Sequence, residues 1–513
     1  MRKRNRGVAV LLAWLLGCFC SLAQSTNPYL VADFAEKDFE SMLQLCHQGG
    51  FEYLLHRSPF STYGHYRWNP DFASRGNRSV ARMVQTADEE GVHLGLYLQA
   101  DAISVNDAYF SPKHYKELLR QGEVKLFDDI RADQSDIAIY KNELLHQPST
   151  LNLLLVGDEL ISYGTMEVSG DLMFLHQCKR GAYGTQPADH HRNAHVYKLA
   201  DSPERFVYPD GALRDSVRQR LSDRMAAAGI TFIENSVSPG HELLNEMQRV
   251  QNVERWSKAS KSQDGRELML GWFPVRVAEQ HQQSTTIEDV EWLLSKAAAF
   301  DAGYGMLLES NAVRRHGQMD KMLSLAKAWN ELRSSRLLNK DQKEALRDPY
   351  QDWHLERLAE NHFLLYPLYV SRRYRCSLSQ NEEGHCISEP VEWNVENDGR
   401  FGLRVYAEGK GELVNLRLHL PDGIVLFPCT LGAGQILWYD FGEIALVTDR
   451  DYHTIDTVKP EGELTLPSGE FMVLVECERV NKKPCPEVSV RYLTRETPEY
   501  IAKDKKQDDV PNK

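Results

Sequence analysis

Four carboxylate residues stand at or just after the ends of apolar segments, where side chains could meet a substrate. They are Glu234, Asp101, Asp107 and Glu309. Two carboxyl groups on one rim can cleave a glycosidic bond, because one protonates the leaving oxygen while the other attacks the sugar or activates water. Each acid could instead cap a turn or a helix. Glu234 is the strongest candidate, since it directly follows the β-type run Thr231-Phe232-Ile233.

A second group of residues could bind a substrate. Most of them follow the apolar run at residues 51–55, where aromatic rings alternate with hydrogen-bonding side chains. Closely spaced aromatic rings can stack on a sugar ring, and the polar side chains between them can form hydrogen bonds with its hydroxyls. The candidates are His56, Arg57, Tyr63, His65, Trp68, Asn106, Asn235 and Trp272. For Trp272 a place in the core is the alternative.

The stretch at residues 267–310 indicates what positions these side chains. Its apolar run at 268–273 lacks helical periodicity, as in a strand covered on both faces. Thr285 or Thr286 ahead of Glu288 and Asp289 predicts a helix start, and Gly303 a helix stop before a strand at 304–308. This is a βαβ unit, and such units carry functional residues at the carboxyl ends of their strands.

Further βα units precede this stretch. Strands are expected near Tyr29, Phe51, His93, Ile230, Leu268 and Tyr304, with helices at about 35–47, 77–90, 210–228, 241–256 and 318–336. This order predicts a (β/α)8 TIM-like barrel over residues 24–370, with its last strands sought between 351 and 370. An open doubly wound sheet is the alternative, although no Gly-rich phosphate loop supports it. We expect no cofactor.

Two regions lack the alternation of strands and helices. Residues 121–199 alternate β-type residues with Gly turns, which predicts a small β-hairpin insert in the barrel. This insert resembles a short β module, GDELI-Y…RGA-GT-A-H, of extracellular and phage-tail proteins. His190, His191 and His195 lie there, but their spacing favours structural or solvated roles over a metal site. Residues 371–497 predict an antiparallel β-sandwich, and the polar residues 498–513 a disordered tail.

The first 23 residues have the form of a signal peptide, with a basic start, a short apolar region and small residues before Gln24. We expect export to the periplasm or cell surface, with a lipoprotein at Cys18 as the weaker alternative. No later segment is apolar enough for a transmembrane anchor. Removal of the segment takes the formal charge from −13 to −17, which argues against nucleic-acid partners.

Seven of the nine cysteines follow the signal segment. Cys376/Cys386 and Cys477/Cys485 are close pairs that an oxidising compartment could bridge. Because seven is an odd number, one of Cys46, Cys178 and Cys429 is expected as a buried free thiol. The sequence leaves the oligomeric state open.

The block FEYLLHRSPFSTYGHYRWNPDF through GVHLGLYLQ looks like the second-to-third-strand segment of α-galactosidase-like barrel glycosidases. ISVNDAYFSP, GWFPVR and IEDVEWLLSKAAAFDAGYGM are similar to exported bacterial carbohydrate-active barrels with a C-terminal sandwich. The resemblance implies a barrel glycosidase. It departs at ITFIENS, where Ile233 stands in place of the expected nucleophilic Asp and Glu234 comes one residue later. A shift of one residue reverses a side chain's direction on a strand.

Three functions compete for these observations. The first is an exported glycoside hydrolase acting on complex oligo- or polysaccharides through Glu234 and one of the other acids. The second is a polysaccharide lyase on the same scaffold, with a base among His56, Tyr63 and His65 and with Arg57 neutralising a uronate. The third is a glycan-binding protein without activity. A carbohydrate is the partner in all three.

Overall fold

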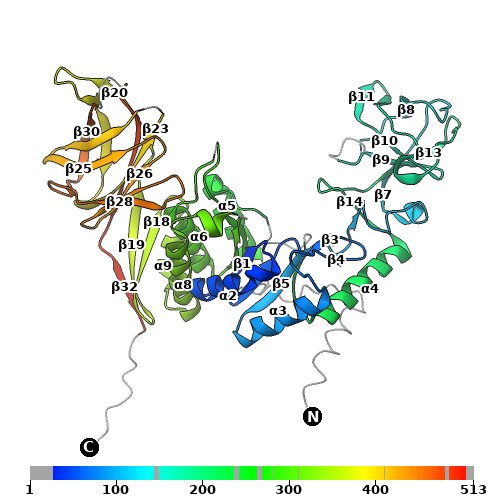
Figure 1. Cartoon of the computed structure of the whole chain (residues 1–513), viewed down its shortest axis with the longest axis horizontal. Helices are drawn as coiled ribbons and strands as arrows, with labels where there is room; N and C mark the ends of the chain where they lie inside the picture. The colour runs from blue at the N-terminus through cyan, green and yellow to red at the C-terminus, as the bar shows by residue number, and fades with distance from the viewer. Residues whose placement is uncertain are drawn as a thin grey trace, which may run out of the picture. The chain divides into compact units, whose positions relative to one another are not determined.

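The computed structural model describes residues 27–143, 150–235, 242–262, 268–280, 282–309, 311–409, 411–479 and 484–503. The predicted signal peptide therefore lies outside the described residues. The chain is a mixed α/β protein with a large β region at its C-terminal end (Figure 1). It divides into two compact units, of which one holds residues 34–40 and 55–235 and the other 27–33, 41–54 and 242–503.

A parallel sheet contains the six strands that the sequence predicts. They are β1 (Tyr29–Ala32), β2 (Tyr53–His56), β5 (His93–Leu98), β15 (Phe232–Asn235), β16 (Met269–Val275) and β17 (Gly303–Leu308), in the order β15-β5-β2-β1-β17-β16. Residues 242–244 continue it, since Leu244 N donates to Trp272 O at 2.8 Å beside β16. A closed barrel of eight strands is not defined by the described residues and stays a prediction.

Helices alternate with these strands, as the periodicity predicts, except that the helix expected at 241–256 begins only at Arg249, because residues 242–244 extend the sheet. They are α2 (Phe39–Gly49), α3 (Asn77–Glu89), α4 (Gly211–Ala228), α5 (Arg249–Ser262), α6 (Ile287–Phe300), α7 (Ala312–Arg315), α8 (Met319–Ser335) and α9 (Lys340–Leu346). In α6 the Thr286 hydroxyl accepts from Asp289 N, and the Asp289 side chain accepts from Thr286 N, which confirms the predicted N-terminus. Asp301, in the left-handed conformation, ends the helix in place of the expected Gly303.

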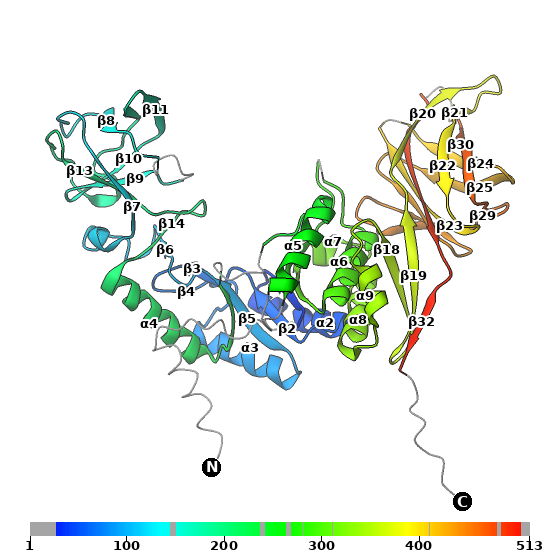
Figure 2. The same cartoon turned by 180° about the vertical axis from the view of Figure 1, so that it is seen from behind.

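Helix α6 is buried along almost its whole length, because α8, α9 and a C-terminal strand pack on it (Figure 2). That strand, β18 (Asp352–Ala359), forms an antiparallel hairpin with β19 (His362–Val370), and β19 pairs with strands β31 and β32 of the C-terminal sheet. The expectation that residues 351–370 supply the last parallel strands is therefore wrong. None of the described helices is both long and apolar enough to cross a membrane.

The first unit also contains short strands and the predicted β insert. The short strands are β3 (Phe60–Thr62), β4 (Arg67–Trp68), β6 (Ile103–Ser104) and β14 (Phe206–Val207), with 3-10 turns η1 (Glu36–Asp38) and η2 (Tyr115–Glu117). The insert has a four-stranded sheet, β10-β9-β13-β7, and a three-stranded sheet, β11-β12-β8, around one apolar core. Its strands are β7 (Arg120–Lys125), β8 (Ile137–Tyr140), β9 (Leu153–Val156), β10 (Glu159–Ser162), β11 (Thr165–Ser169), β12 (Leu172–His176) and β13 (His195–Leu199).

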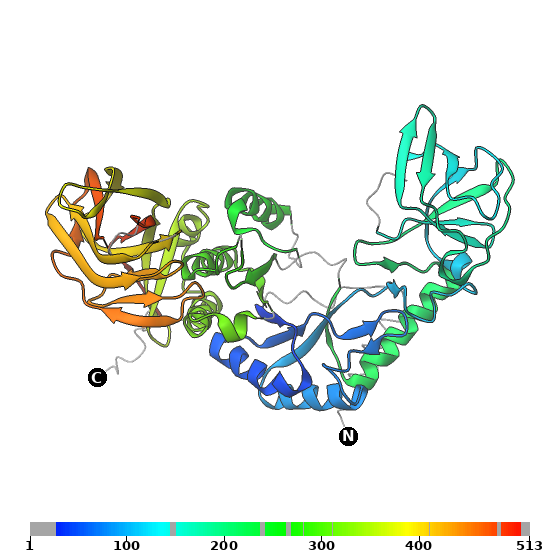
Figure 3. The ribbon, with the colours of Figure 1, turned by 45° about the horizontal axis from the view of Figure 1, so that its top comes forward.

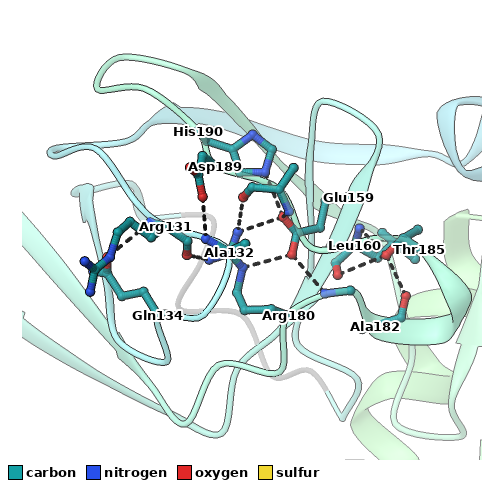
Figure 4. A network of polar contacts seen from close by, with 12 residues as sticks. Arg131, Ala132, Gln134, Glu159, Leu160, Arg180, Ala182, Thr185, Asp189 and His190 are labelled. Atoms are coloured by element: carbon teal, nitrogen blue, oxygen red, sulfur yellow. Dashed lines mark hydrogen bonds and ion pairs between the residues drawn. The ribbon is translucent and has the colours of Figure 1, made fainter.

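Polar contacts among the motif residues of the insert explain its sequence pattern (Figure 4). Glu159 of GDELI accepts two hydrogen bonds from Arg180 of RGA, at 2.9 and 2.8 Å, and contacts His190 at 2.7 Å. Thr185 of the GT pair accepts from Leu160 N at 3.1 Å. His190 thus has a structural role, His191 is exposed, and His195 pairs with Glu123, as the histidine spacing predicts.

The C-terminal β region forms one core from strands that pair antiparallel (Figure 3). Its further strands are β20 (Tyr374–Gln380), β21 (Cys386–Ser388), β22 (Val391–Val395), β23 (Gly399–Glu408), β24 (Leu413–Leu420), β25 (Gly423–Leu431), β26 (Ile436–Asp440), β27 (Ala445–Thr448), β28 (Thr454–Val458), β29 (Thr465–Leu466), β30 (Gly469–Glu478), β31 (Glu487–Arg495) and β32 (Glu499–Ala502). Residues 499–502 were expected in a disordered tail. They pair with β19 instead, because that strand offers a free edge to bond.

The disulfide differs from the expected pairs. Cys386 is bonded to Cys485, with the Cα atoms 5.5 Å apart, while Cys376 and Cys477 are buried free thiols. The prediction paired cysteines that are close in sequence, whereas sheet neighbours far apart in sequence decide which sulfurs meet. Cys46, Cys178 and Cys429 are also free and buried.

Candidate functional site

Glu234 lies at the carboxyl end of β15, and only 5% of its surface is exposed. Burial raises the pKa of its carboxyl to about 7, because a low-dielectric environment disfavours the charged form. Among the described residues, none donates a hydrogen bond to this carboxyl. Glu234 is therefore about half protonated near neutral pH. A general acid that works at neutral pH needs a pKa of this size.

Tyr97 is the neighbour of Glu234 on the adjacent strand. The two residues are directly paired in the parallel register of β5 and β15, so their side chains share one face of the sheet. Burial raises the pKa of the Tyr97 hydroxyl, and the charges of Glu204 and Glu234 raise it further while Arg57 lowers it. The charges of Glu204, Arg57 and Glu234 thus all influence the pKa of this hydroxyl.

Glu204 and Arg57 differ from Glu234 in their contact with water. Both are exposed, and Glu204 lies in the turn that precedes β14. Water stabilises a carboxylate in its charged form, whereas the site of Glu234 excludes water from most of the side chain. When one carboxyl group is buried and the other is solvated, the two can take different catalytic roles.

Asp101 and Asp107 are held by other side chains. Arg218 of α4 donates two hydrogen bonds to Asp101, both at 2.7 Å. Asp107 accepts from His65 N at 3.0 Å and Tyr109 N at 3.0 Å, and its Oδ1 contacts His65 Nδ1 at 2.7 Å. Asp107 thus holds its own turn and joins it to the segment at His65, as the turn-holding alternative predicts, while Asp101 is occupied by an ion pair with α4.

The predicted aromatic binding residues are mostly packed against each other. His56 is buried, with Nε2 3.1 Å from Phe34 O and its ring against Phe72. The Trp68 indole N–H donates to Asn77 Oδ1 at 2.6 Å. The Tyr63 ring contacts Phe60, Tyr66 and Phe206, and the His65 ring stacks on Tyr109. These rings build the loop core that supports the sheet edge.

Two predicted residues lie in the second compact unit. Glu309 follows β17, as expected, and accepts a hydrogen bond from Arg276 Nε at 3.3 Å. Trp272 lies in the middle of β16 and is buried, and its Nε1 donates to the Tyr29 hydroxyl at 2.8 Å. The expectation of Trp272 on the rim is wrong, because β16 continues for three residues beyond it.

The last two predicted residues add little to the geometry. Asn106 is exposed beside Asp107. Asn235 ends β15, and its side chain lies outside the described part of the chain.

Sequence reasoning missed Tyr97 and Glu204. Tyr97 could have been found, because it lies on the strand expected near His93, where alternate residues share a face and point toward the same side of the sheet. Glu204 could not, since it stands in a turn after the insert and only the fold brings it close to β5.

The comparisons with known proteins give no family. No family model matches the chain, and no curated protein matches it. An alpha-amylase from Geobacillus thermoleovorans complexed with acarbose is 11% identical, with 89% of this chain and 100% of that chain covered and a TM-score of 0.34. A GH36 alpha-galactosidase from Geobacillus stearothermophilus is 10% identical, with 89% and 55% covered and a TM-score of 0.32. TM-scores this low support no conclusion about fold or function.

Proposed function

We propose that the chain is a glycoside hydrolase built on a β/α-barrel scaffold, with Glu234 as the general acid. The observation that carries the proposal is a buried carboxyl at a parallel strand end, paired with Tyr97 and with its pKa raised to about 7. A carboxyl of this kind can protonate a glycosidic oxygen as the bond to the leaving sugar breaks.

Glu204 is the second carboxylate of the proposed mechanism. It is exposed, and its charge raises the pKa of the same tyrosine hydroxyl that the charge of Glu234 raises, which supports a place for both acids in one site of the first unit. In this position Glu204 attacks the sugar carbon or removes a proton from the attacking water. Asp101 and Asp107 are left out of the pair because Arg218 and His65 hold them. Arg57 supplies hydrogen-bond donors for substrate hydroxyls.

The lyase alternative has less support from the contacts. His56 is engaged with the Phe34 carbonyl and His65 with Asp107, so neither is placed to take a proton from a uronate. The charge of Arg57 lowers the pKa of the Tyr97 hydroxyl, as it would for a lyase base, but burial and two glutamates raise that pKa, which opposes the action of Tyr97 as a base.

Glu234→Gln tests the assignment on a panel of oligosaccharides. Loss of a general acid lowers turnover by about 10²- to 10⁴-fold. Glu40→Gln is the matched control, because Glu40 is an exposed glutamate in the same unit. Wild-type turnover should fall as the pH rises above about 7, where Glu234 loses its proton. Unchanged turnover in Glu234→Gln would remove Glu234 from the mechanism.

Glu204→Ala tests the partner. Its lost turnover should return with added azide, which attacks the sugar carbon from the face opposite the leaving group in place of the missing carboxylate or of the water it activates, and the anomeric configuration of the wild-type product reports whether cleavage retains or inverts. Glu234→Gln should not respond in this way with an unactivated substrate. If the wild-type protein binds glycans and cleaves none of the panel, the glycan-binding alternative takes the place of the hydrolase.

Export of the protein is a further part of the proposal. It rests on the basic and apolar composition of residues 1–23, and the Cys386–Cys485 disulfide is compatible with an oxidising compartment. Intact-mass measurement of the protein from its native cells should show an N-terminus at Gln24. A lipid-modified Cys18 would instead support the lipoprotein alternative, and an uncleaved N-terminus would contradict both.

A further inference from the structure

A cleft of about 430 Å³ lies in the second compact unit, and none of the residues that line it is assigned to catalysis. Its walls come from the loop between β16 and α6, the end of β23, the turn before β26 and the loop after β27; Figure 1 labels β23, β26 and α6. This volume falls in the range of small-molecule sites in proteins. The side chains that line it decide what it could hold.

The walls of the cleft are fixed by hydrogen bonds. Asp451 accepts from Ala278 N at 2.9 Å and from the Ser284 hydroxyl at 3.0 Å, so the two loops are joined. On the other side, Ala407 N donates to Gln435 O at 3.0 Å and Gly434 N to Ala407 O at 2.8 Å. A cleft with such anchored walls is pre-formed, and a ligand would lose little free energy to ordering it.

Two arginines line the cleft, and they differ in whether a carboxylate pairs with them. Arg373 donates to Glu408 at 2.5 Å, and its guanidinium covers the Tyr406 ring at 3.7 Å, so this pair is neutral and hides the aromatic face. Arg450 is exposed, and none of the described carboxylates lies within ion-pair distance of its guanidinium. Arg450 runs along the turn at Gly434, where an added Cβ would be only 3.0 Å from its Cδ.

The remaining polar groups of the cleft are amides. Gln282, Gln283 and Gln435 all line it. Gln282 and Gln283 each offer a donor and an acceptor, while Gln435 offers its donor, since its Oε1 accepts from Gly432 N at 2.7 Å. A sugar hydroxyl can use both kinds of partner. A planar guanidinium can bind a carboxylate through two parallel hydrogen bonds. An arginine beside several amides is suited to a ligand that is anionic and rich in hydroxyls.

We propose that this cleft binds an acidic saccharide, with Arg450 holding a uronate carboxylate and the three glutamines holding ring hydroxyls. The site does not depend on the hydrolase assignment, because no residue of the cleft belongs to the proposed catalytic pair. It would let the protein hold a polyuronate chain whether or not the proposed catalytic pair acts on it.

Titration calorimetry of the full chain with trigalacturonic acid tests the proposal. Binding should weaken by about tenfold or more in Arg450→Gln, since a lost charge-assisted hydrogen bond is of that size. Arg314→Gln is the matched control, because Arg314 is an exposed arginine of the same unit outside the cleft. It should leave the affinity unchanged, and Gln283→Ala should weaken binding by a few fold.

Three results would overturn the assignment. Binding of trigalacturonic acid that Arg450→Gln leaves intact would place the ligand elsewhere. Equal binding of neutral galactotriose would remove the role of the charge, and binding of inorganic phosphate with displacement of the sugar would identify a general anion site. Glu234→Gln should bind trigalacturonic acid with the affinity of the wild type. Turnover therefore tests the hydrolase assignment, and the affinity for trigalacturonic acid tests the cleft assignment separately.

Discussion

Glu159 and Glu234 are both buried glutamates of the first compact unit, yet their surroundings drive them to opposite protonation states. Glu159 is 1% exposed and Glu234 is 5% exposed. For Glu159, burial acts to raise the pKa, but hydrogen bonds from Arg180, His190, Gly181 N and Ala188 N together lower it below the usual range. For Glu234, burial acts alone, and the pKa rises to about 7.

This difference separates a structural carboxylate from a reactive one. Burial by itself does not indicate function, because a buried charge that is fully paired is stable and chemically inert. A buried carboxyl that the protein leaves without donors remains able to exchange a proton near neutral pH. Substitutions at the two glutamates should therefore have opposite effects on stability.

The largest expected effect is at Glu159. Glu159→Gln leaves the Arg180 guanidinium buried without its carboxylate, which should lower the free energy of unfolding by about 3–5 kcal/mol. Hydrogen exchange in β9 and β10 measures it, because these strands carry the network. Glu167→Gln is the control, since Glu167 is exposed in the same insert. A loss below about 1 kcal/mol would show that the neighbouring backbone contacts, and not the ion pair, hold the motif.

The next effect is at Glu234 and has the opposite sign. Because the folded pKa is about 7 against 4.5 for a free glutamate, the folded state holds more protons than the unfolded state between these values. Stability therefore falls as the pH rises through this window, by on the order of 3 kcal/mol in total. Glu234→Gln removes the titrating group, so it should raise the melting temperature relative to wild type at pH 8 and change it little at pH 4.5.

Glu40→Gln controls for the loss of a negative charge in this comparison, because Glu40 is exposed in the same unit. A stabilisation by Glu234→Gln that is equal at both pH values would contradict the raised pKa. Destabilisation at pH 8 would mean that the carboxylate has a partner that stabilises its charged form.

A smaller effect is expected at Thr185, which supports the Glu159 network. Its hydroxyl accepts from Leu160 N at 3.1 Å and donates to Ala182 O at 2.9 Å. Thr185→Val keeps the shape and leaves both backbone groups without this partner, which should cost about 1–2 kcal/mol of stability. Thr165→Val, at an exposed threonine of the insert, should cost less than about 0.5 kcal/mol. Equal losses in the two variants, measured by urea unfolding, would contradict the structural role of the hydroxyl.

The two glutamates also show what the sequence could and could not predict. Strand and helix order followed from apolar periodicity, and Glu234 followed from its place after Ile233, because both depend on neighbours in the chain. The partners of an acid depend on distant segments. Arg218 is 117 residues away from Asp101 in the sequence. The sequence therefore could not show that Asp101 and Asp107 have hydrogen-bond donors while Glu234 has none among the described residues. The same reason explains the wrong disulfide pairs, since Cys386 and Cys485 are 99 residues apart.

The smallest effect concerns Tyr97 and tests whether burial alone sets the state of Glu234. The raised pKa of Tyr97 keeps its hydroxyl neutral at pH 7, so Tyr97→Phe removes a dipole and no charge. The pKa of Glu234 should then move by less than about half a unit, which corresponds to under about 0.7 kcal/mol. Carbon-13 NMR titration of labelled glutamate carboxyls, with Glu234→Gln to assign the signal, measures this shift. A fall of a full unit or more would show that the hydroxyl accepts a hydrogen bond from the protonated carboxyl, and Glu234 would then resemble Glu159 in being set by a partner.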